Sequence, residues 1–161
     1  MERKERIALA LEEMRSFNSF QFDSGDSLDQ KGSSLFSSAS LILTLITTIV
    51  VSIGWGQPRD PAYWIALGVA SLLYLVMTIV FLLNIGPRKY LTALAADREV
   101  IAREIIDREG EEAVLALIAG YVEAIGHNQQ VNDSKKVAVW AMLVLLPLIV
   151  ASLIAVGILA Q

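Results

Sequence analysis

The chain has no cysteine and only one histidine, His127, among its 161 residues. Thiol catalysis and disulfide bonds are therefore excluded, and a zinc site, which needs several thiolate or imidazole ligands, is not expected. Charged residues make up 19% of the chain and are confined almost wholly to residues 1–31 and 86–136. Neither segment is basic enough for a nucleic-acid surface. We expect no cofactor, no metal and no nucleic-acid partner.

Charge is missing altogether from three long apolar runs, residues 33–54, 62–83 and 137–159. Each has about 22 residues, and a helix of that length is about 33 Å long, enough to cross the hydrocarbon core of a bilayer. The whole chain is 55% hydrophobic. The sequence therefore predicts an all-α integral membrane protein with three transmembrane helices over these ranges, in contact with the lipid bilayer.

The distribution of lysine and arginine predicts the orientation of these helices. Basic residues are enriched in cytoplasmic segments next to a span. They precede the first run and bracket residues 86–136, whereas the connection 55–61 contains only Arg59, beside Asp60. We expect a multi-pass protein of the cell (inner) membrane with a cytoplasmic N-terminus, a cytoplasmic segment 86–136 and an external C-terminus.

The polar segments are predicted to be helical as well, so the chain is expected to form a single helical membrane domain, 1–161. The N-terminal segment, residues 1–26, is predicted to contain an amphipathic helix over residues 2–20, with Ile7, Leu11 and Met14 on one face, and to lead into a turn at Asp23–Ser27. From there a helix is expected to enter the first span without a break. Residues 86–136 are predicted to be a helical hairpin divided at Gly110.

Leucine, isoleucine and valine recur at helical spacing in the cytoplasmic hairpin. These positions are a candidate assembly surface: Leu91, Leu94, Ile101, Ile105, Leu115, Ile118, Val122 and Ile125. Such stripes usually pack within the chain or join subunits. A ligand pocket is the less favoured interpretation, because no glycine-rich phosphate loop or basic cluster accompanies them.

Catalysis inside a membrane normally requires an ionisable side chain within a span, and the three runs contain none. We therefore predict that the protein is not an enzyme. The polar groups in the runs are mainly hydroxyls, clustered on one face of the first span and more weakly on the second. They either line close helix contacts or face a water path in an oligomer. The candidate residues are Ser33, Ser37, Ser40, Thr44, Thr47, Thr48, Ser71, Tyr74 and Thr78.

Pro147 lies about midway along the third run and removes one helical hydrogen bond. The resulting kink has two interpretations. It is either a fixed feature of the architecture or a hinge between closed and open forms.

Two segments next to the spans carry a resemblance to a known group of proteins. The run Leu28–Phe36, with Asp29, Lys31 and then small residues, resembles the entry to the first span in small prokaryotic membrane effectors of anti-phage conflict systems, the Pycsar-type and SLATT-like proteins. Tyr121–Lys136 is similar to their second membrane-proximal segment. The resemblance implies a helical membrane protein that stays inactive until infection is sensed and then oligomerises or opens. This chain has no recognisable cyclic-nucleotide domain, so a separate sensor protein would supply the signal.

Two functions follow from these observations. The first is a homo-oligomeric, channel-like membrane effector that perturbs membrane integrity when it is activated, in anti-phage defence. The alternative is a non-conducting membrane adaptor or structural subunit that docks a cytosolic partner protein through its amphipathic helices.

Overall fold

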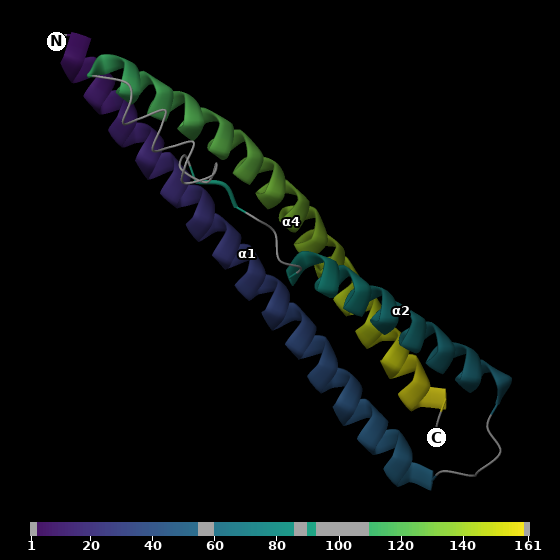
Figure 1. The fold of residues 1–161 in the computed structure, drawn as a ribbon. Coiled ribbons are helices and arrows are strands. Elements are labelled where there is room, and N and C mark those ends of the chain that lie inside the picture. The colour runs from purple at the N-terminus through teal and green to yellow at the C-terminus, as the bar shows by residue number, and fades with distance from the viewer. Residues whose placement is uncertain (1–2, 55–59, 86–89, 93–109, 160–161) are drawn as a thin grey trace. The chain divides into compact units, whose positions relative to one another are not determined.

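The computed structural model describes residues 3–54, 60–85, 90–92 and 110–159 (Figure 1). Three helices account for nearly all of them: α1 (Arg3–Gly54), α2 (Pro61–Ile85) and α4 (Glu111–Leu159). No strand occurs within these ranges. The predicted all-α fold is confirmed.

Helix α1 runs for 52 residues without a break, so the predicted turn at Asp23–Ser27 is wrong. The residues that suggested a turn lie on two sides of one helix. Asp23, Asp26 and Ser27 are exposed, whereas Gly25 is buried. A side chain at Gly25 would overlap the Tyr90 ring and hydroxyl, so this glycine permits a close contact and does not end the helix.

Helix α4 begins where the sequence predicted and continues further than a cytoplasmic hairpin requires. Gly110 has a φ of 65°, a left-handed conformation that suits glycine, and Glu111 and Glu112 occupy the first turn. The helix then continues through Pro147 to Leu159. In the other half of the predicted hairpin, residues 90–92 are described and lie outside the helices, so the prediction of a helix is wrong at Leu91. Leu94, Ile101 and Ile105 lie outside the described residues.

Both long helices bury side chains at alternating steps of three and four residues, the repeat of a coiled-coil seam. On α1 these buried and half-buried positions run from Ile7 to Ile46, and on α4 from Tyr121 to Val156. The seam of each helix is therefore continuous across the point where its sequence changes from charged to apolar.

The chain divides into two compact units. Residues 1–27 and 87–134 form one, which we name the polar unit, and residues 28–86 and 135–161 form the other, the apolar unit. The three predicted spans lie in the apolar unit. Its core consists of residues from all three helices: Leu28, Ala39, Ala70, Met77, Val139, Met142, Ile149 and Leu153.

Two helices are long and apolar enough to cross a membrane, α2 over Pro61–Asn84 and α4. Only 11% and 22% of their apolar stretches are buried within the chain, so their leucines and isoleucines need cover from lipid or another protein. The predicted span at residues 33–54 is not among them. Over its described side chains, which end at Thr48, serine and threonine interrupt the leucines and isoleucines.

Candidate functional site

Four carboxamide side chains are buried in the seam of the polar unit. Asn18 and Gln21 come from α1, and Asn128 and Asn132 come from α4. Their exposed fractions are 6%, 7%, 0% and 2%. Each occupies a seam position where an apolar residue would normally lie, because the spacing of three and four residues continues through them. A buried amide costs free energy unless its donors and acceptor are paired.

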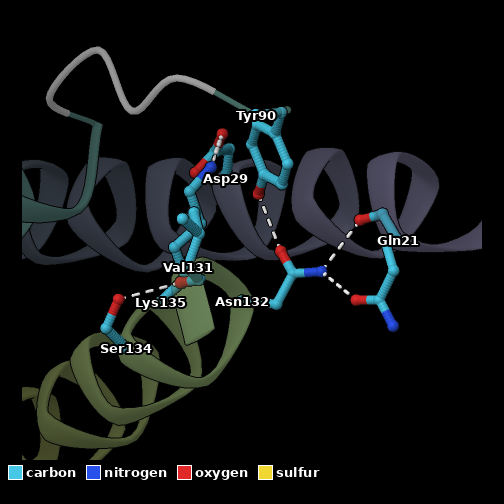
Figure 2. Close-up of polar contacts among 7 residues, drawn as sticks. All are labelled: Gln21, Asp29, Tyr90, Val131, Asn132, Ser134 and Lys135. Carbon is cyan, nitrogen blue, oxygen red and sulfur yellow. Dashed lines mark hydrogen bonds and ion pairs between the residues drawn. The ribbon is translucent and has the colours of Figure 1, made fainter. Parts of the chain in front are cut away.

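The asparagines of α4 are paired with α1 and with residues 90–91. The Asn128 amide nitrogen donates to Asn18 Oδ1 at 3.0 Å and to the Leu91 carbonyl at 2.8 Å, and Asn128 Oδ1 accepts from the Leu91 N–H at 2.8 Å. The Asn132 amide donates to the backbone and side-chain oxygens of Gln21, both at 2.8 Å (Figure 2). Both N–H groups of each amide are therefore paired.

Tyr90 completes this network from outside the helices. Its hydroxyl donates to Asn132 Oδ1 at 2.7 Å (Figure 2). Its ring packs against Phe22, with centroids 5.3 Å apart. The same ring lies against Gly25 on α1, where no Cβ would fit. The contact between an aromatic ring and the backbone of a helix thus depends on one glycine.

The apolar unit contains a nearly buried ion pair. Lys135 Nζ lies 2.5 Å from Asp29 Oδ2, and the exposed fractions of the two side chains are 4% and 37% (Figure 2). The other carboxylate oxygen, Asp29 Oδ1, is buried and has no hydrogen-bond partner among the described residues. The pair joins α1 to α4 in the segment just before the apolar runs.

Asn84, near the end of α2, is a second polar group buried in the apolar unit. It is completely buried, and neither its amide nitrogen nor its oxygen has a hydrogen-bond partner in the described structure. Its amide lies against Gly32 of α1, where an added Cβ would come within 2.8 Å of Nδ2 and 3.2 Å of the Met142 methyl carbon. Gly32 therefore allows α2 to approach α1 closely at this level.

Most of the predicted hydroxyl stripe on α1 faces away from the rest of the chain. Only Ser40 is half-buried, and its hydroxyl lies 2.9 Å from the Tyr74 hydroxyl of α2. Ser40, Thr44 and Thr48 also donate to the carbonyl four residues earlier. These residues of the stripe are exposed: Ser33, Ser37, Thr44, Thr47 and Thr48. Packing within the chain therefore explains Ser40 and leaves the others unexplained.

The weaker stripe on α2 is divided between surface and interior. Ser71 is exposed and donates to the Leu67 carbonyl at 2.8 Å, whereas Thr78 is half-buried and donates to the Tyr74 carbonyl at 2.9 Å. Tyr74 stacks on Phe36 of α1, with ring centroids 5.9 Å apart. Tyr74 and Thr78 thus belong to the packed side of α2.

The predicted assembly surface is also divided. Leu115 and Val122 are exposed on α4, whereas Ile118 and Ile125 are half-buried in the chain. Leu91 is half-buried beside Asn128. Pro147 lies within a continuous helix, and its role as a hinge stays a prediction.

The predicted site residues did not include the buried polar residues, although three on α4 lie in the segment Tyr121–Lys136 that carries the resemblance; the six are Asn18, Gln21, Asn84, Asn128, Asn132 and Lys135. The seven-residue spacing of the seam was the available signal, because Asn18 and Gln21 on α1 and Asn128, Asn132 and Lys135 on α4 fit it. No cluster of three potential metal-ligating His, Cys, Asp or Glu side chains occurs in the described part of the chain.

Comparisons with protein families, curated proteins and solved structures gave no significant match to the chain.

Proposed function

We propose that this protein is a homo-oligomeric membrane protein with three spans, residues 33–54 included, and that the hydroxyl stripe of α1 faces the same stripe of neighbouring subunits around a path for water and ions. The observation that supports the proposal is the exposure of Ser33, Ser37, Thr44 and Thr47 on a helix whose opposite side is buried. Hydroxyl oxygens carry two acceptor lone pairs and can hydrate such a path without a charged filter.

The proposal gives the two kinds of exposed surface different environments. The leucines and isoleucines of α2 and α4 face lipid, which is their most favourable surroundings. The hydroxyl face of α1 turns inward, where small residues allow subunits to approach and water can replace lipid. In this arrangement the polar unit lies in the cytoplasm, the C-terminus lies outside, and oligomer opening compromises the inner membrane.

Dye release from liposomes tests the path, and the structure supplies a matched pair of variants. Replacing Ser37, Thr44 and Thr47 together by leucine should keep the oligomer intact and abolish release, because the three side chains do not pack within the chain. The control is Ser34→Leu, an exposed serine on the same helix but outside the stripe. A triple variant that assembles and still releases dye would refute the pore, and one that dissociates would assign the stripe to packing.

The setting in anti-phage defence is part of this proposal and is supported by the resemblance at Leu28–Phe36 and Tyr121–Lys136. Cells that express the protein with its neighbouring genes should resist phage better than cells that carry the triple leucine variant. Equal plating efficiency on the two strains would remove the defence role and leave the membrane role standing.

The alternative is a non-conducting adaptor, and the exposure of Leu115 and Val122 favours it. Both residues lie on an exposed side of α4, away from the buried asparagines, and are available to a cytosolic partner. Replacing both by serine should abolish co-purification of such a partner without changing membrane permeability. Loss of dye release with no partner found would instead place these residues in the oligomer.

A further inference from the structure

Residues 90–92 are held in the polar unit in the manner of a bound peptide. They lie outside the helices, and we name them the strap. The Leu91 N–H and carbonyl both pair with the Asn128 side chain, each at 2.8 Å. A carboxamide offers one acceptor and donors in the same plane, so it pairs with an extended backbone as a neighbouring strand would. This contact recognises the main chain and is independent of the Leu91 side chain.

The contacts of Tyr90 add selectivity for a side chain. Its hydroxyl requires the acceptor Asn132 Oδ1, and its ring requires Phe22 on one side and a position without Cβ at Gly25. A phenylalanine would lose the hydrogen bond, and a smaller side chain would leave the ring site unfilled. The three contacts together select a tyrosine.

The helices orient this site without help from the strap. Asn128 is fixed by Asn18 Oδ1, and Asn132 is fixed by two oxygens of Gln21. The amide faces that bind the strap are therefore presented by α1 and α4 themselves. A preorganised site of this kind binds a ligand at a lower entropic cost than a mobile one.

We propose that Asn128, Asn132, Gly25 and Phe22 form a binding site for an extended peptide that carries a tyrosine and pairs through the main chain of the next residue, and that the strap occupies this site at rest. Displacement of the strap by the same segment of a second copy would be the activating event, since that segment carries the tyrosine and backbone groups that the site binds. This last step rests on the proposed function, because the strap follows α2 in the chain through residues 86–89 only.

Hydrogen exchange of the Leu91 amide in the full-length protein tests the resting state. This amide lies outside the helices, yet its exchange should be slower by about tenfold than in Asn128→Ala, corresponding to about 1.4 kcal/mol. Asn128→Asp is the second variant, because it keeps the size and the acceptor oxygens but cannot donate to the Leu91 carbonyl. Fast exchange at Leu91 in the unmodified protein would overturn the proposal.

Binding of a synthetic peptide of residues 87–94 tests the site itself. The full-length variant Tyr90→Ala with Leu91→Ala should bind it more tightly than the unmodified protein does, whose own strap competes. Within that variant, a peptide with phenylalanine in place of tyrosine should bind about fivefold more weakly. Adding Gly25→Ala should weaken binding by about ten- to a hundredfold. Gly126→Ala is the control for the glycine change, since a Cβ there meets nothing within 4 Å.

The source of the displacing segment is identified by mixing two full-length variants. A Gly25→Ala chain has a strap but a blocked site, and the Tyr90→Ala, Leu91→Ala chain has a site but a defective strap. Co-purification of the two through the peptide site assigns the ligand to a second copy, and peptide binding without co-purification would overturn that assignment. Failure of every chain to bind the peptide, with slow Leu91 exchange retained, would overturn the site. Neither readout depends on membrane permeability.

Discussion

Replacing Asp29 by asparagine should destabilise the protein more than replacing Lys135 by methionine. The reason is the unequal burial of the ion pair, since the exposed fraction of the side chain is 4% for Lys135 and 37% for Asp29. Asparagine at position 29 leaves an ammonium group in nearly dry surroundings without its carboxylate. Methionine at position 135 leaves an aspartate whose side chain is already 37% exposed, although its Oδ1 is buried, and keeps the apolar volume of the lysine stem.

The expected magnitudes follow from this difference. Breaking a fully buried pair costs about 3–5 kcal/mol, and the partial exposure of Asp29 lowers this to about 2–3 kcal/mol for Asp29→Asn. Lys135→Met should cost about 1 kcal/mol or less. For a chain of this length, 1 kcal/mol shifts the Tm by about 2–4 °C. The Tm should therefore fall by about 4–12 °C in the first variant and by about 4 °C or less in the second.

Thermal unfolding in detergent, followed by tryptophan fluorescence, measures both shifts. The double variant Asp29→Leu with Lys135→Met is the control, and it should regain most of the stability because it buries no charge. Equal losses in the two single variants, or a larger loss in Lys135→Met, would refute the argument from burial.

Three further predictions concern the apolar unit. Gly32→Ala should destabilise it by about 1–3 kcal/mol, because the new methyl group overlaps the Asn84 amide, whereas Gly68→Ala, with open space around it, should be neutral or slightly stabilising in thermal unfolding. Asn84→Leu should raise the Tm, since it removes two unpaired buried polar atoms, and a fall of several degrees would show that the amide is satisfied. Ser40→Ala and Tyr74→Phe should each cost about 0.6 kcal/mol and the double variant no more than either, because both remove the same hydroxyl contact; additive losses in a double-mutant cycle would contradict this.

The helices could be predicted because their signals are local. Apolar runs of about 22 residues mark the helical segments, and Gly110 followed by Glu111 and Glu112 marks the start of α4. The predicted turn at Asp23–Ser27 is wrong because glycine and aspartate are common in turns, whereas here they lie within a continuous helix. The role of the glycine depends on a non-local contact. Gly25 is small to admit Tyr90, which lies far away in the sequence.

The candidate site could be predicted only in part, because some of its features are local in sequence and others are not. The hydroxyl face of α1 follows from helical spacing alone, and its exposure agrees with a function outside the chain. The buried asparagines fit the repeat of three and four residues, but their partners do not follow from it. Asn128 bonds the Leu91 backbone and Asn132 bonds the Tyr90 hydroxyl across 37 and 42 residues of chain, so helical spacing does not indicate these contacts.

The two buried amide pairs of the polar unit, Asn18 with Asn128 and Gln21 with Asn132, also determine the register in which α1 and α4 pack there. An apolar seam with a seven-residue repeat pairs almost equally well after a slip of seven residues, because leucine and isoleucine are interchangeable there. Such a slip would separate Asn128 from Asn18 and Asn132 from Gln21, and each buried amide left unpaired costs about 1–3 kcal/mol. The asparagines therefore select one register, and only in that register does Gly25 lie opposite Asn132 with room for the Tyr90 ring.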